Sequence, residues 1–165
     1  MPDQPANQQR EEDFHFPPRK ILVAVDGSSN SFRAVEIATK IAKRFGAEMR
    51  ILYVLQSTSA LLYAISGPGT PAVLSDQYFE SAEDEATSFL GRMMSVAKGN
   101  GVHCTEEIVR TTSSIVNTIV LDAKAQSIDL IIIGTRGLGG FGRMLLGSIS
   151  SGVVAHAGCS VLVVR

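Results

Sequence analysis

The sequence predicts an α/β protein built on a parallel β-sheet with helices on both faces. Apolar strand-like runs and helical patterns alternate five times along the chain, and this alternation is typical of such a sheet. The chain has 165 residues, of which 45% are hydrophobic and 19% charged, so it can form one domain with a proper core. A glycine-rich stretch directly after the fourth strand-like run predicts where a ligand binds.

The first strand and helix have clear limits. Lys20 to Val25 is an apolar run, and Asp26-Gly27-Ser28-Ser29 after it is a turn and helix N-cap signal. The following helix should end at Gly46, and five of its apolar residues share one face, namely Ala34, Ile37, Ala38, Ile41 and Phe45.

The middle of the chain contains the second and third strands. Arg50 to Leu55 is predicted as the second strand and Val102 to Arg110 as the third. A long helix is expected from about Leu74 to Lys98, with its acidic residues on a solvated face. The irregular stretch from Gln56 to Ala72 has an apolar middle, so a lid, a partner contact or packing on the sheet are the alternatives.

The last part completes the alternation. Ser113 or Ser114 should cap a helix whose buried face carries Ile115, Ile119 and Ala123. An apolar strand at 129–133 leads into the glycines, and a short helix from Ser148 to Ala157 precedes the final strand. The polar residues 1–18 are expected to form a disordered tail before a domain at 19–165.

The glycine-rich stretch is Gly134-Thr135-Arg136-Gly137, then nine residues, then Gly147-Ser148. Glycines let backbone N–H groups approach a ligand closely, and a helix N-terminus adds unpaired donors and a positive dipole. The stretch therefore predicts a site for an anion, most plausibly a phosphate chain; a loop without ligand is the alternative.

Two common nucleotide motifs do not fit these glycines. A G-x-G-x-x-G pattern occurs at 137–142, but the dinucleotide fingerprint belongs after the first strand and needs an acidic residue about 20 positions later. No carboxylate follows Gly158. The Walker pattern is absent, because Gly142 is followed by Arg143-Met144.

The spacing G-x2-G-x9-G-[ST] at 134–148 resembles the nucleotide-binding branch of the universal stress protein family, and the resemblance covers nearly all of 19–165. It implies an adenine nucleotide alpha hydrolase-like, Rossmann-like fold with an open five-stranded sheet in the order 3-2-1-4-5. It also implies that the glycine motif holds the ribose and phosphates of ATP. Strands one and four would then be neighbours, and the ligand would bind at this topological switch point.

The expected site residues follow from the motif and the resemblance. Asp26 ends the first strand and would accept hydrogen bonds from ribose hydroxyls or help to hold a metal; an N-cap role is the alternative. By resemblance Val54 reads the adenine edge with its backbone. The full expected set is Ala24, Val25, Asp26, Val54, Ile133, Gly134, Arg136, Gly137, Gly147, Ser148, Ile149 and Ser150.

The expected ligand is ATP, or AMP, ADP or cyclic AMP, with Mg²⁺ or Mn²⁺. No catalytic set and no protein-only metal site are expected, because the three histidines are far apart in the sequence. The leading hypothesis is a nucleotide-dependent regulator; the alternative is a slow ATP hydrolase or an autokinase that phosphorylates a serine such as Ser148. A flavin or nicotinamide enzyme is excluded by the position of the fingerprint.

Charge and composition limit the possible binding partners and the cellular compartment. A net charge of −1 gives no electrostatic case for nucleic acid or an anionic membrane, and no apolar run is long enough for a membrane span. Two cysteines are too few for a disulfide framework, so we expect a cytoplasmic protein. Ser160 to Val164 should lie at the sheet edge and build a homodimer.

Overall fold

The computed structural model describes residues 16–56, 72–135 and 146–165. In chain order the elements are β1 (Lys20–Val25), α2 (Ser29–Phe45), β2 (Glu48–Gln56), α4 (Ala72–Gly99), β3 (Cys104–Thr111), α5 (Ile115–Ala125), β4 (Leu130–Gly134), α6 (Ser148–His156) and β5 (Ser160–Val164). The predicted alternation of strands and helices is confirmed. Most of the stretch Gln56 to Ala72 and of the tail lies outside the described residues.

The five strands form one parallel sheet in the order β3-β2-β1-β4-β5. β1 lies at its centre, with Lys20 to Val25 opposite Glu48 to Tyr53 of β2 and Ile21 to Ala24 opposite Leu130 to Ile133 of β4. The predicted strand order is therefore confirmed, including the neighbouring positions of the first and fourth strands.

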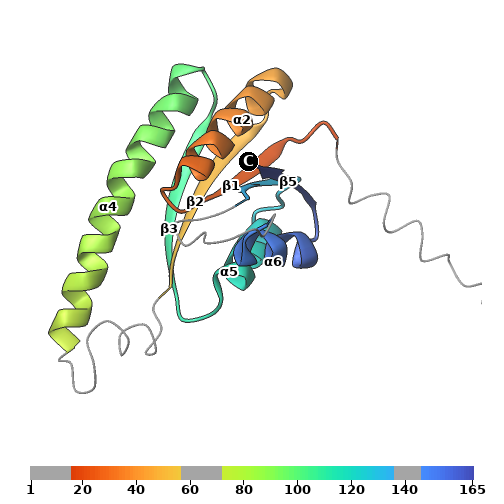
Figure 1. Cartoon of the computed structure of the whole chain (residues 1–165). Coiled ribbons are helices and arrows are strands. Elements are labelled where there is room, and N and C mark those ends of the chain that lie inside the picture. Colours follow the sequence, from red (N-terminus) through yellow and green to blue (C-terminus); the bar gives the residue numbers. More distant parts are fainter. Residues whose placement is uncertain (1–15, 57–71, 136–145) are drawn as a thin grey trace, which may run out of the picture.

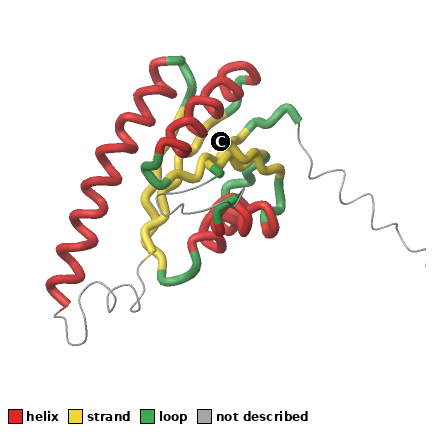
Figure 2. The backbone as a smooth tube through the Cα atoms, viewed as in Figure 1, coloured by secondary structure: helices red, strands yellow, loops and turns green. Residues whose placement is uncertain are grey.

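Two helices cover each face of the sheet. α2 and α4 lie together on one side, and α5 and α6 lie on the other (Figures 1 and 2). Side chains alternate along β1: Val23 and Val25 belong to the apolar cluster under α2 and α4, whereas Leu22 and Ala24 belong to the cluster under α5 and α6. The central strands are thus buried on both faces, which explains their continuous apolar runs.

The helix limits follow from local hydrogen bonds. Ser28 is the N-cap of α2, since its hydroxyl accepts from the Ser31 N–H at 3.2 Å. The cap therefore lies within the predicted signal Asp26 to Ser29, and the alternative of an N-cap role for Asp26 is wrong. Gly46 ends α2 with φ 69°, a left-handed conformation that favours glycine, as predicted. Ser114 caps α5, which decides between the two predicted serines.

The limits of three strands differ from the sequence prediction, and for β4 the difference is one residue at each end, since it runs from Leu130 to Gly134. β2 begins at Glu48 and ends at Gln56, because it finds partners on β1 and β3 along this whole length. β3 begins at Cys104 and not at Val102, whose N–H instead bonds the Ala97 carbonyl at the end of α4. Phe45 shares a face with buried residues in the sequence pattern, yet its side chain is 43% exposed at the last turn of α2.

Among the described residues, no helix is long and apolar enough to cross a membrane.

Candidate functional site

The switch point lies where β1 and β4 end side by side. Ala24 pairs with Ile133, and beyond this pair the two chains diverge, β1 toward α2 and β4 toward the motif glycines. Ala24 and Ile133 are both buried, with 6% of each exposed. Ligands in open α/β sheets bind in the crevice that such a divergence creates.

Asp26 follows the last residue of β1 and is partly buried. Its carboxylate Oδ1 accepts a hydrogen bond from the Ser28 N–H at 3.0 Å, which fixes the turn into α2. Asp26 therefore combines a structural role with a place at the edge where a ligand is expected.

Val54 lies two residues before the end of β2, which is one residue longer at this end than the predicted strand Arg50 to Leu55. The pairing of β1 with β2 stops at Val25 opposite Tyr53, whereas β2 continues beside β3 to Gln56. Val54, Leu55 and Gln56 thus extend past β1 without a partner strand on that side. Backbone N–H and C=O groups on that side can therefore hydrogen-bond a ligand.

The expected apolar lining divides between the two faces of the sheet. The side chains of Ala24, Val54 and Ile133 belong to the cluster under α5 and α6, to which Ile149 of α6 also packs. Val25 points to the opposite face, into the cluster under α2 and α4. Only the backbone of Val25 can therefore line a site shared with the other three.

Hydrogen bonds to Thr135 close the base of the glycine-rich loop. The Thr135 carbonyl accepts from the Gly147 N–H at 2.7 Å and from the Ser150 hydroxyl at 3.0 Å. The Thr135 N–H donates to the Val164 carbonyl of β5 at 2.6 Å. No local sequence pattern predicts this role of Thr135, because its hydrogen-bond partners lie 12 to 29 positions away in the sequence.

These bonds change the expected donors at the start of α6. The Gly147 N–H is used by Thr135, and the Ser150 hydroxyl, in a residue only 2% exposed, donates within the protein. The first helical hydrogen bond is made by the Ser151 N–H to the Gly147 carbonyl at 2.9 Å. The N–H groups of Ser148, Ile149 and Ser150 thus remain as the unpaired first-turn donors of α6 within the described residues.

The helix begins at Ser148, as predicted. Gly147 is its N-cap with φ −73° and ψ 163°, an extended conformation that any residue adopts. Ser148 is the first helical residue and not the cap, and it is exposed. Arg136 and Gly137 lie outside the described residues.

Gly134 is required by close packing. A Cβ at this position would lie 3.0 Å from the Asn30 Cβ and 3.1 Å from the Asn30 carbonyl carbon in the first turn of α2. The end of β4 therefore touches the start of α2, and any side chain at 134 would push the two apart. The sequence motif marks Gly134 as a ligand residue, and the structure adds this packing role.

The described part of the chain gives no support for a metal site made of protein side chains alone or for a reactive cysteine. No group of three or more His, Cys, Asp or Glu side chains there could hold a metal ion. Burial raises the pKa of the Cys104 thiol to about 12, with a further contribution from Glu106. Burial also raises the pKa of the Cys159 thiol. Neither cysteine is activated as a nucleophile.

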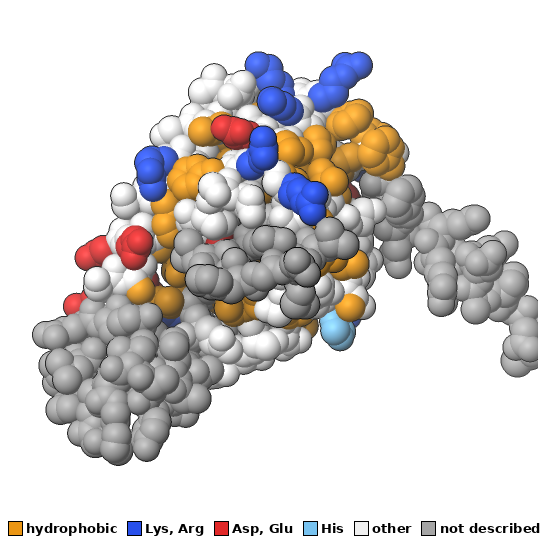
Figure 3. All heavy atoms as spheres, in the orientation of Figure 1, with side chains coloured by type: hydrophobic (Ala, Val, Ile, Leu, Met, Phe, Trp, Pro, Cys, Tyr) orange, Lys and Arg blue, Asp and Glu red, His pale blue; other side chains and the backbone are white. Residues whose placement is uncertain are grey.

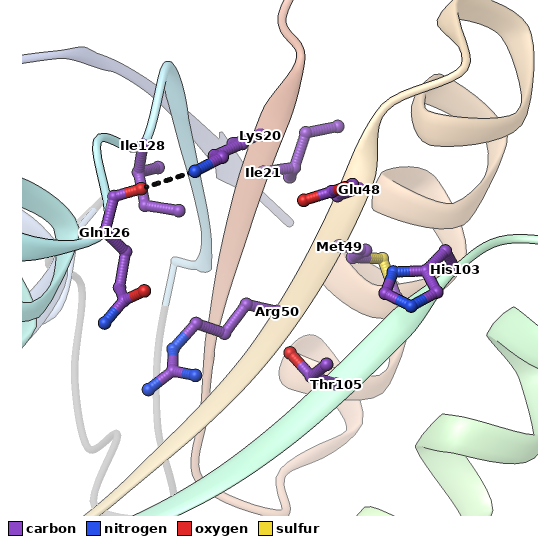
Figure 4. A pocket seen from close by; sticks show the side chains of 9 residues that line it. All are labelled: Lys20, Ile21, Glu48, Met49, Arg50, His103, Thr105, Gln126 and Ile128. Atoms are coloured by element: carbon purple, nitrogen blue, oxygen red, sulfur yellow. Dashed lines mark hydrogen bonds between the residues drawn. The ribbon is translucent and has the colours of Figure 1, made fainter.

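A cavity of about 260 Å³ lies at the opposite edge, where the strands begin (Figure 4). The Lys and Arg side chains that line this cavity already have partners within the protein. The Lys20 ammonium donates to the Gln126 carbonyl at 3.3 Å, and the Arg50 guanidinium donates two 3.1 Å hydrogen bonds to the Asp122 carboxylate. None of the predicted site residues lines this cavity. The candidate site is therefore the carboxyl edge.

Comparisons with known proteins agree on one family. The model of the universal stress protein family matches residues 17–165. The universal stress protein YxiE of Bacillus subtilis is 31% identical over 147 residues, which cover 88% of this chain and 98% of that protein. A universal stress protein of Methanocaldococcus jannaschii is 33% identical over 147 residues, covering 89% of this chain and 82% of that protein.

Solved structures give the same result. The universal stress protein UspA from Lactobacillus plantarum has 33% sequence identity and a TM-score of 0.71, over 88% of this chain and 97% of that one. A universal stress protein crystallised in complex with cAMP has 26% identity and a TM-score of 0.66, over 90% of this chain and 97% of that one.

Proposed function

Because this chain belongs to the universal stress protein family, we propose that it binds an adenine nucleotide at the carboxyl edge of its sheet and acts as a nucleotide-dependent stress regulator. One observation carries the proposal: the N–H groups of Ser148, Ile149 and Ser150, which have no partner among the described residues, open α6 next to the end of β4. Such a helix start favours phosphate. The related structure with bound cAMP supports the adenine class.

The proposal gives each part of the edge a role. Phosphate oxygens accept from the first turn of α6, with Gly134, Gly137 and Gly147 allowing close approach and Arg136 adding charge. Asp26 accepts from ribose hydroxyls. The backbone of Val54, beyond the end of β1, bonds the adenine edge, above an apolar floor formed by Ala24, Ile133 and Ile149. The proposed nucleotide domain is 19–165.

ATP with Mg²⁺ or Mn²⁺ is the proposed form of the ligand. Mg²⁺ in nucleotide sites usually takes one or two carboxylates together with phosphate oxygens and waters. Asp26 supplies one carboxylate at this edge, so the residues present fit a metal held mainly by the nucleotide. Metal would neutralise phosphate charge, and the protein itself would supply positioning and hydrogen bonds.

Two measurements test the ligand. Mass spectrometry of freshly purified protein should release an adenine nucleotide, and titration should show stronger binding of ATP than of GTP, because a backbone reader presents a fixed donor and acceptor pattern. Equal affinity for ATP and GTP would refute the adenine assignment. Incubation with metal and labelled ATP should give no turnover and no labelled serine; label on Ser148 would favour the autokinase alternative.

We propose a homodimer built by β5. Among the described residues this strand pairs only with β4 and lies at the end of the sheet, so its other edge has no partner strand there. Leu162 of β5 is 36% exposed beside it. A two-fold pairing would cover both features. Sedimentation should give a dimer at micromolar concentration and a monomer for Leu162→Lys; a monomeric parent protein would refute the proposed dimer.

A cytoplasmic location, where ATP is present and thiols stay reduced, is also part of the proposed function.

A further inference from the structure

The exposed face of α2 is strongly basic. Arg33, Lys40, Lys43 and Arg44 are all exposed there and recur at helical spacing, with Glu36 as the single acid. The helix thus carries a net charge of +3 within a chain whose net charge is −1. Figure 3 shows Lys and Arg side chains gathered over this side of the molecule, with apolar side chains between them.

Most of these cations have no partner in the described part of the chain. The Arg33 guanidinium donates to the Arg165 carbonyl at 3.1 Å. Lys40, Lys43 and Arg44 form no ion pair with any described residue. Solvated single cations are common on protein surfaces, but three unpaired cations within five residues form a local positive field.

An aromatic contact brings the N-terminal segment to the end of this face. The rings of Phe16 and Phe45 meet edge to face, with centroids 5.6 Å apart. Phe45 directly follows Lys43 and Arg44, so this contact places Phe16 at the end of α2 that carries these cations. Glu11, Glu12 and Asp13 lie three to five positions before Phe16, and a chain of five residues reaches about 18 Å at most.

We propose that the acidic segment Glu11 to Asp13 of the same chain docks on the basic face of α2. Three carboxylates match the charge of Lys40, Lys43 and Arg44. The Phe16 contact tethers the segment, which raises its effective concentration at this surface. Single exposed ion pairs contribute little, so the tether is essential to the proposal. The docked segment would neutralise α2, the only strongly basic helix in the described part of the chain, and keep it from anionic partners.

Carbodiimide cross-linking of the full chain tests this docking, because the reagent joins a carboxylate directly to a lysine in contact. Lys20 is the internal reference: it lies seven positions after Asp13, so a tail that is merely tethered reaches it too. Products of Glu11 to Asp13 with Lys40 and Lys43 should exceed those with Lys20 about threefold at low salt. At about 1 M salt, where the Debye length is about 3 Å, this excess should disappear.

Matched variants and mixed isotopes complete the experiment. Phe45→Ser removes the aromatic contact and should reduce the Lys43 products to the Lys20 level. Leu121→Ser changes another exposed apolar residue, 56% exposed on α5, and should leave the products unchanged. Products that favour Lys20 in the parent protein would overturn the proposal. The same reaction in a mixture of ¹⁴N-labelled and ¹⁵N-labelled protein shows whether a cross-link joins one chain to itself or two chains. Products that mainly join a ¹⁴N copy to a ¹⁵N copy would also overturn the proposal, since the occupant would then be a second chain.

Discussion

Gly147→Val tests the proposed phosphate site most directly. Gly147 has φ −73°, so valine fits its backbone without strain. The change costs only a poorer N-cap, about 1 kcal/mol, and should lower Tm by about 2–4 °C. The branched side chain would lie where phosphate approaches the first turn of α6. Losing one or two charge-assisted hydrogen bonds of about 1.5–3 kcal/mol each should weaken ATP binding roughly a hundredfold.

Calorimetric titration with ATP and circular dichroism measure the two effects separately. Gly158→Val is the matched control, because an added Cβ there meets no atom within 4 Å and the residue lies after α6, away from its first turn. It should bind ATP as the parent protein does. If Gly147→Val keeps the native spectrum and binds ATP with unchanged affinity, the first turn of α6 is not the phosphate site.

Three further predictions concern the fold. Gly152→Ala should lower the free energy of unfolding by about 1 kcal/mol net, because the added Cβ would come 2.7 Å from Val116 Cγ2. This clash outweighs the gain in helix propensity from replacing glycine by alanine. Urea unfolding measures the change, and a variant more stable than the parent protein would contradict the prediction. Gly91→Ala, whose Cβ meets nothing within 4 Å in α4, should raise the same free energy by about 0.5–1 kcal/mol. Cys104, with its pKa raised to about 12, should resist iodoacetamide at neutral pH until the protein unfolds. Since the folded pKa lies above the ordinary 9.0, this thiol's contribution to stability is complete below pH 9 and is lost as the pH rises toward 12; rapid native alkylation would contradict it.

The sequence was sufficient for the fold because the elements have strong local patterns. β1 is predicted with its limits correct, since an apolar run meets a turn signal at one end and polar residues at the other. The limits of β2 were wrong because strand length depends on partners: Glu48 and Gln56 belong to the strand only through β1 and β3. The order of strands came from the family resemblance, since periodicity carries no information on which strands pair.

The candidate site was predictable in position but not in hydrogen bonding. The glycine spacing pointed to the edge at Gly134 and Gly147, and the β1–β4 pairing confirms that Asp26 and Gly134 lie at the ends of neighbouring strands. The sequence could not show that Thr135 takes the Gly147 N–H and the Ser150 hydroxyl, because these are tertiary contacts. Asn30 was missed for the same reason: its contact with Gly134 joins residues of two separate elements.

The hydrogen bonds of Thr135 have a consequence for the evolution of such proteins. They join the end of β4 to the start of α6 without using any residue of the segment 136–146. The entropy of closing a loop grows only slowly with its length. Insertions, deletions and wholesale exchange of this segment between relatives should therefore change the ligand while the scaffold stays the same. A chimaera carrying another relative's segment between Thr135 and Gly147 is a practical route to new binding specificity.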